Sequence, residues 1–249
     1  MSEWSKNQEK DFWNECTYHS KLIWNCFNPD LNKKPFKNTY VLIAGCGATP
    51  VLENSVASFI VNLDISTESL KKLKSQSPKS NLIAADLENL PFQSSSFNYA
   101  ICMQVLHHTK LINSLNELKK ALLKNGTLIS IDINKRNAAG FILRLGFTLL
   151  SYILPTRTLY LRNPHECPLH VSELTNLLYT QGFKITTLTS YLFLSPLFLI
   201  PLVTFFPESE KSSTLYKIME AFLKFDTKIG EATTFKRIGY NIVCISIKL

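Results

Sequence analysis

Gly45, Gly47 and Asp64 form the pattern in this sequence with the clearest chemical meaning. Glycine has no Cβ, so a turn through Gly45 and Gly47 lets a ligand approach the backbone closely. Asp64 follows an apolar run, and a carboxylate at the carboxyl end of a parallel strand can accept hydrogen bonds from both hydroxyls of a ribose. Together the three residues predict a pocket for a nucleoside or an amino-acid group.

A second set of reactive side chains lies at Gln104, His107 and His108, directly after the apolar run 99–103. An imidazole, with an ordinary pKa of about 6.5, can accept a proton from a hydroxyl, an amine or an acidic carbon. His107 and His108 are therefore candidate catalytic bases. The alternative, a structural pair that positions its loop, stays open.

The elements that must position these residues are apolar runs separated by polar turns. Short runs bounded by turn residues predict strands, and amphipathic runs predict the helices that cover them. The expected strands are 40–44, 58–63, 81–85, 99–103, 127–132, 183–188 and 240–248, and the expected helices include 66–74, 114–123, 171–180 and 214–225. Open α/β sheets bind ligands at the carboxyl ends of their strands, where the candidate residues are expected to lie.

Four segments resemble the class I S-adenosylmethionine (SAM)-dependent methyltransferases: residues 40–64, 84–92, 96–108 and 117–128. Their order and spacing are similar to those of the family over about 40–132, and 171–185 fits the helix and strand that usually follow. The resemblance implies a Rossmann-like α/β sheet of seven mainly parallel strands with an inserted apolar helical cap. It implies a single domain over 1–249 with a SAM-binding core at about 38–132.

The resemblance also implies the ligand and its contacts. SAM would be the methyl donor and S-adenosylhomocysteine the product. Gly45 and Gly47 would pass close to the methionine part, and Asp64 would bind the ribose. Asp86 would accept a hydrogen bond from the adenine amine; the alternative is that its side chain caps its own loop. Asp86 and Leu87 would hold the adenine, and Gln104 would line the pocket near the sulfonium. The complete implied cofactor set is Ala44, Gly45, Cys46, Gly47, Asp64, Ile65, Asp86, Leu87 and Gln104.

Two apolar runs, 138–154 and 191–206, are expected to cover the site. They fall in insertions at about 133–170 and 190–225, where the family places substrate-covering elements. Burial of an apolar ligand contributes about 25 cal/mol per Å², so a cover rich in Leu, Ile and Phe favours an apolar or lipid-like acceptor. Packing of the two runs against each other is the alternative. Prolines and short length argue against a transmembrane helix in 191–206.

Four more side chains are candidate substrate contacts. Trp13, Tyr18 and His19 lie in an N-terminal segment that often covers the site in the resembled family. His165 lies in the polar loop after the first apolar run, where it could pair with Glu166. Ordinary packing of the N-terminal residues, and a surface position for His165, are the alternatives.

Composition sets limits on partners and location. The 249-residue chain has a formal net charge of +8, but its lysines are scattered through the sequence. They are not accompanied by a series of interleaved arginine and aromatic residues, which favours a solvated surface over nucleic-acid binding. Six cysteines without close metal-type spacing predict reduced thiols, no bound metal and a cytoplasmic protein. The polar N-terminus lacks the apolar core of a signal peptide. Lysines near the cap could add attraction to anionic lipid, so peripheral membrane contact is also expected.

The predicted function is methyl transfer from SAM to a small, apolar or lipid-like acceptor. Ile43 and Thr49 stand where the family has an acidic residue and a third glycine, and they favour a rival interpretation, a catalytically silent binding protein of the same fold. A peripheral membrane module is the second rival. The incomplete Gly-x-Gly-x-x-Gly pattern argues against a dinucleotide oxidoreductase.

Overall fold

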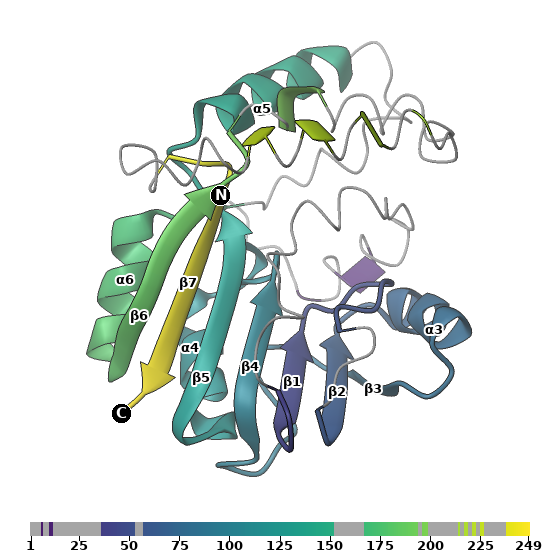
Figure 1. Ribbon diagram of the computed structural model, residues 1–249, viewed down its shortest axis with the longest axis vertical. Helices are drawn as coiled ribbons and strands as arrows, with labels where there is room; N and C mark the ends of the chain where they lie inside the picture. The colour runs from purple at the N-terminus through teal and green to yellow at the C-terminus, as the bar shows by residue number, and fades with distance from the viewer. Residues whose placement is uncertain are drawn as a thin grey trace.

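The computed structural model describes residues 36–52, 57–151, 167–193 and 238–249 continuously, with shorter pieces at 6, 10–11, 196–198, 214, 217–218, 221–222 and 225–226. This part of the chain forms a seven-stranded sheet in the order β3-β2-β1-β4-β5-β7-β6 (Figure 1). The strand order reverses beside β1, between β1 and β4. In open α/β sheets the crevice at such a reversal is where ligands bind.

The strands occupy the apolar runs expected from the sequence. They are β1 Tyr40–Ala44, β2 Phe59–Asp64, β3 Asn81–Ala84, β4 Phe97–Met103, β5 Leu122–Ile133, β6 Phe183–Tyr191 and β7 Asn241–Lys248. Strands β3, β2, β1, β4 and β5 pair in parallel, while β7 runs antiparallel to both β5 and β6. The predicted sheet of seven mainly parallel strands is confirmed.

The helices lie between the strands in the chain. They are α3 Thr67–Gln76, α4 Leu111–Ala121, α5 Ala138–Ser151 and α6 Val171–Thr180, with a short 3-10 helix, η2, at Leu106–His108. Ser66 caps α3 by accepting a hydrogen bond from the amide of Ser69 at 3.1 Å. Gly182 follows α6 with φ of +77°, a conformation that suits glycine, and the chain turns directly into β6.

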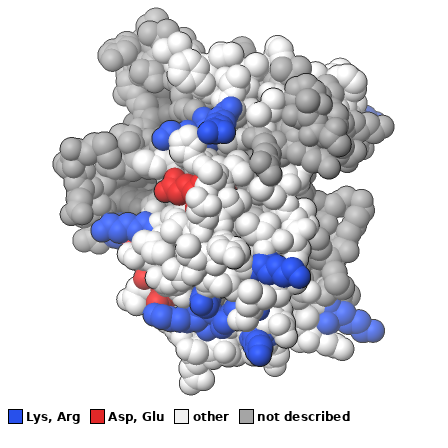
Figure 2. All heavy atoms as spheres, turned by 90° about the vertical axis from the view of Figure 1, so that its left-hand side faces the viewer, with Lys and Arg blue, Asp and Glu red and all other residues white. Residues whose placement is uncertain are grey.

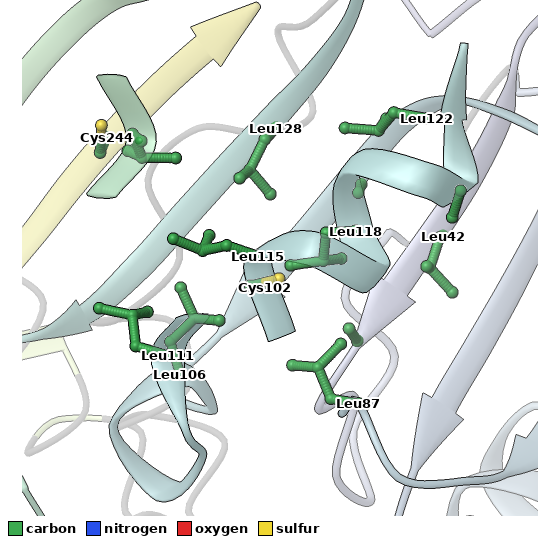
Figure 3. Close-up of a cluster of buried hydrophobic side chains, with 14 of the residues drawn as sticks. Leu42, Leu87, Cys102, Leu106, Leu111, Leu115, Leu118, Leu122, Leu128 and Cys244 are labelled. Atoms are coloured by element: carbon green, nitrogen blue, oxygen red, sulfur yellow. The ribbon is translucent and has the colours of Figure 1, made fainter. Parts of the chain in front are cut away.

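Alternation along each strand gives the sheet a core on both faces. On one face, Leu42 and Cys102 pack with Leu115 and Leu118 of α4 (Figure 3). On the other face, Ile43 packs in a cluster that includes Leu70 and Leu73 of α3. Because both faces are covered, the strands are fixed and the loops at their carboxyl ends are held in place.

Several predicted boundaries were wrong by a few residues. Helix α4 begins at Leu111 rather than at 114, and β5 begins at Leu122 rather than at 127. The early part of β5 contains Asn125 with φ of +62°, and its pairing with β4 shifts register there. The irregular pairing explains why periodicity did not mark this start.

The first apolar run forms α5, which lies beyond the carboxyl ends of the parallel strands (Figure 1). Tyr191, predicted to begin the second run, instead ends β6. Of the remainder of that run, residues 192–193 and 196–198 are described, and 196–198 are helical. No helix among the described residues is both long and apolar enough to cross a membrane.

Basic side chains are distributed over the face that carries β6 and α6 (Figure 2). Uncharged surface separates most of them, and one group lies at the end of the molecule opposite α5. At the end of β7, the Lys248 ammonium donates to the carbonyl of Leu122 at 2.6 Å. Partial burial, together with the neighbouring charge of Lys119, lowers the pKa of Lys248.

Candidate functional site

The glycine turn after β1 is shaped by a close approach of two chain segments. The amide of Gly45 donates to the carbonyl of Leu63 at 2.8 Å, which ties the turn to the end of β2. Gly45 and Gly47 have φ of +71° and +58°. A Cβ on Gly45 would lie 2.5 Å from the Cβ of Val105. Gly45 is therefore required by contact with the loop after β4 as well as by its own backbone conformation.

Asp64, the last residue of β2, lies beside this turn. One carboxylate oxygen accepts the amide of Gly47 at 2.8 Å and the other accepts the amide of Ser66 at 2.9 Å. The amide of Ile65 also bonds to this carboxylate. A carboxylate has about four lone-pair positions, so the three amides leave it acceptor capacity for a ligand hydroxyl.

Burial raises the pKa of Asp64, and the amides of Ser66, Gly47 and Ile65 oppose this rise. Ala44 and Cys46 are fully buried, and Ile65 is half-buried. Burial, with the nearby Asp64 carboxylate, raises the pKa of the Cys46 thiol well above its usual value. The side chains of Ala44 and Cys46 are thus not exposed to a ligand.

The loop after β3 carries Asp86 and Leu87. The Asp86 carboxylate accepts the amide of Glu88 at 3.0 Å and lies 3.7 Å from the ammonium of Lys6. Leu87 is buried in the core beside α4. Asp86 thus caps its own loop, as the alternative interpretation predicted, and its contact with adenine stays a prediction.

Gln104 connects the loop after β4 to the far strands of the sheet. It has φ of +53°, in the left-handed region that few residues other than glycine adopt. Its amide donates to Ile131 at 2.8 Å, and its side-chain Nε2 donates to Oδ1 of Asn241 at 2.8 Å. Because the next residue, Val105, contacts Gly45, the structure brings Gln104 to the same edge as the glycine turn.

His107 is part of a buried hydrogen-bonded pair. Its Nδ1 is hydrogen-bonded to Asp132, and the two residues are only 3% and 0% exposed. The Asp132 carboxylate also accepts the backbone amides of Leu106 at 3.1 Å and His107 at 3.3 Å. A carboxylate has only acceptor atoms, and that of Asp132 already accepts hydrogen bonds from two amides. Nδ1 of His107 is therefore the donor of the side-chain bond.

His108 differs from its neighbour in burial and charge. It is half-buried, and its ring centroid lies 3.9 Å from that of His107. Burial, followed by the charges of His107 and Lys6, lowers the pKa of His108 well below its usual value. The His108 imidazole is therefore uncharged at neutral pH.

Four predicted substrate contacts cannot be placed, and two residues near the site were not predicted from the sequence. Trp13, Tyr18, His19 and His165 lie outside the described residues. Asp132 was given no role, although an acidic residue near the carboxyl end of a parallel strand is the signal that identified Asp64. Asn241 was also missed, because no local pattern indicates which side chain an antiparallel strand places beside Gln104.

Comparisons with known proteins agree with this architecture. Residues 42–130 match the family described as a methyltransferase domain. The chain is 35% identical over 104 residues to an uncharacterized protein of Methanocaldococcus jannaschii, covering 42% of this chain and 44% of that protein. It is 29% identical over 126 residues to the tRNA U34 carboxymethyltransferase of Glaesserella parasuis, covering 46% and 38%. The chain thus spans less than half the length of these curated relatives.

A solved structure extends the likeness to the whole fold. Geranyl diphosphate C-methyltransferase from Streptomyces coelicolor superposes with a TM-score of 0.59 at 12% identity, covering 98% of this chain and 97% of that one. The fold is that of the class I methyltransferases. Within it, residues 42–130 match the methyltransferase-domain family, in agreement with the resemblance found in the sequence.

Proposed function

We propose that the protein is a SAM-dependent methyltransferase, with SAM lying across the carboxyl ends of β1, β2 and β4. The observation that carries this proposal is the Asp64 carboxylate, fixed by the amides of Gly47, Ser66 and Ile65 with acceptor capacity left for a ribose hydroxyl. The glycine turn beside it presents backbone without Cβ atoms at Gly45 and Gly47. The methyltransferase domain at 42–130 supports the same placement.

SAM supplies an electrophilic methyl group, so the protein's own work is chiefly positioning and exclusion of water. Ile43, where the family has an acidic residue, is 1% exposed and packs on the α3 side of the core. No carboxylate is therefore available at this position for the amino group of the methionine part. In our proposal, backbone carbonyls of the glycine turn bind that amino group.

Titration calorimetry of S-adenosylhomocysteine into the purified protein tests this proposal. We expect saturable one-to-one binding that SAM competes away, because both ligands share the ribose and the adenine. NAD is the matched control, since it also contains an adenosine but needs a pyrophosphate site. If the folded protein binds neither adenosyl ligand, the proposed methyltransferase activity is wrong, and the alternative of a catalytically silent binding protein is favoured.

The proposed acceptor is small and apolar or lipid-like. In α5, Ala139 and Leu143 are buried, whereas Phe141, Ile142 and Leu145 are more than half exposed. This apolar helix lies beyond the carboxyl ends where the cofactor is placed (Figure 1). The methyltransferase of similar fold from Streptomyces coelicolor was solved with geranyl diphosphate, an acceptor with an apolar chain. Both observations support an apolar acceptor here.

The same proposal includes peripheral contact with a membrane surface. Phe198 is 61% exposed and packs edge-on against Phe222, with ring centroids 5.8 Å apart. Ile218 and Phe225 are also largely exposed. Aromatic and aliphatic side chains of this kind gain free energy on entering the interface of a bilayer.

We expect the wild-type protein to float with phosphatidylglycerol liposomes, and the double variant Leu197→Asp, Phe198→Asp to stay in the soluble fraction. Phe59→Asp is the matched control, because Phe59 is an exposed aromatic residue at the start of β2, on the opposite edge of the sheet. An activity screen of lipid-like and polar acceptors accompanies the flotation. Absence of lipid association, with activity confined to small polar acceptors, would contradict this part of the proposal.

A further inference from the structure

Asn241 occupies a buried position where the last strand begins. In register it pairs with Ile133 at the end of β5 and with Tyr191 at the end of β6, which places it at the carboxyl edge of the sheet. The residue is 0% exposed, and its Oδ1 accepts a hydrogen bond from Nε2 of Gln104. Among the residues that the structure describes, its own Nδ2 has no hydrogen-bond partner.

The neighbouring polar side chains, in contrast, are hydrogen-bonded. Nδ2 of Asn134 donates to Gly239 at 2.9 Å, Nδ2 of Asn137 donates to Ile238 at 2.7 Å, and the Ser190 hydroxyl accepts the amide of Gly239 at 2.9 Å. These three bonds fix the turn that leads into β7. A buried donor that stays unpaired loses its bonds to water without replacement, so it requires an explanation.

The backbone just before Asn241 is closely packed. A Cβ on Gly239 would lie 2.7 Å from both the backbone nitrogen and the backbone oxygen of Tyr191, so the turn is packed directly against β6. The amide of Tyr240 also donates to Leu192 at 2.7 Å. The chain that leads into Asn241 is therefore held against β6 by packing and by a hydrogen bond.

Gln104 connects this donor to the proposed cofactor site. Its left-handed backbone is held by a bond to Ile131, and strained residues that the surroundings fix in this way cluster at ligand sites. Its neighbour Val105 contacts Gly45 of the glycine turn. Asn241 thus lies one side chain away from the segment that borders the proposed methyl donor.

We propose that Asn241 recognises the acceptor substrate, with its Nδ2 donating a hydrogen bond to an oxygen at the acceptor's reacting end. Gln104 is the positioning residue that fixes the orientation of the Asn241 amide. This inference rests on the proposed function and narrows its substrate class. The acceptor is an amphiphile with an apolar body and a carboxylate, carbonyl or hydroxyl at the end that enters the site. An ammonium end is excluded, because it has no lone pair to accept from Nδ2.

The test uses three probes with one apolar chain, octanoate, 1-octanol and octylamine, titrated by calorimetry into the protein saturated with S-adenosylhomocysteine. We expect the wild type to bind octanoate and octanol and to reject octylamine. Asn241→Leu keeps the approximate side-chain size but removes the donor, so it should weaken octanoate binding by about tenfold or more. Equal octanoate affinity in wild type and variant, or no octanoate binding by the wild type, would overturn the inference.

Ser246→Ala is the matched control. Ser246 is on the same strand and its hydroxyl is also buried and unpaired, but it pairs in register with Leu128 and Ile185, away from the carboxyl edge. Its loss should leave all three affinities unchanged. If Asn241→Leu does not fold, Asn241→Asp decides the matter, because an acceptor in place of the donor should reverse the preference to octylamine.

Binding of S-adenosylhomocysteine alone separates this inference from the proposed function. An Asn241→Leu protein that keeps wild-type affinity for S-adenosylhomocysteine and loses octanoate supports both. Normal cofactor binding with unchanged octanoate affinity overturns only the role of Asn241. No cofactor binding by the wild type overturns the proposed function itself.

Discussion

Replacement of Asp64 by alanine is expected to weaken the binding of S-adenosylhomocysteine by roughly ten- to a hundredfold. Loss of a hydrogen bond to a charged group costs about 1.5–3 kcal/mol. The Asp64 carboxylate also accepts the amides of Gly47 and Ser66, so its removal releases the glycine turn as well. Both effects act in the same direction. Calorimetry on the folded variant measures the change.

Two further variants separate the charge of Asp64 from its shape. Asp64→Asn keeps an oxygen for one amide but loses the charge, so its affinity should fall between those of the wild type and the alanine variant. Glu68→Ala removes an exposed carboxylate from the first turn of α3 and should have no effect. Unchanged affinity in Asp64→Ala would exclude this pocket assignment.

The pKa of Asp64 gives the same prediction a pH dependence. Because burial raises this pKa, the carboxyl group binds a proton at a higher pH than an exposed aspartate does. Cofactor affinity should therefore begin to fall at that higher pH as the solution is acidified. In Asp64→Asn this part of the pH dependence should be lost.

The sequence was sufficient to predict the order and type of the elements that carry local signals. Buried parallel strands appear as continuous apolar runs, so β1, β2 and β4 were found within two residues of their bounds. Asp64 was identified because it directly follows such a run. For the same reason Gln104 was expected at the carboxyl edge, where the structure places it.

Contacts between distant segments could not be predicted in this way. Gln104 and Asn241 are 137 residues apart, and their hydrogen bond depends on β7 lying antiparallel between β5 and β6. The bond between His107 and Asp132 likewise depends on the parallel register of β4 and β5. Local periodicity predicts that each strand exists, but it does not set the register between strands.

The side chain most sensitive to substitution in the catalytic step is expected to be His107. Donation from Nδ1 to Asp132 fixes the tautomer, in which Nε2 is the ring nitrogen that carries the lone pair. Loss of a general base lowers turnover by about a hundredfold or more. His107→Ala should therefore reduce turnover by this amount, measured as S-adenosylhomocysteine formation with an acceptor from the screen, and should leave cofactor affinity unchanged.

Variants of the surrounding residues distinguish a base from a structural histidine. His107→Gln preserves a donor to Asp132 and much of the packing but has no basic nitrogen, so it should fold and remain slow. Asp132→Asn should also lower turnover, because it no longer holds the imidazole in the required tautomer. His108→Ala should reduce turnover by tenfold at most, since the uncharged His108 has a supporting position against His107.

The pH–rate profile gives the decisive comparison. In the wild type, turnover should decline at acidic pH as the base becomes protonated, whereas His107→Gln should lack this acidic limb because it has no group to protonate. A purely structural histidine would lower activity by a similar factor at every pH and leave the shape of the profile intact. Full activity in the His107 variants would mean that SAM and acceptor react through positioning alone, with the acceptor's proton leaving to water.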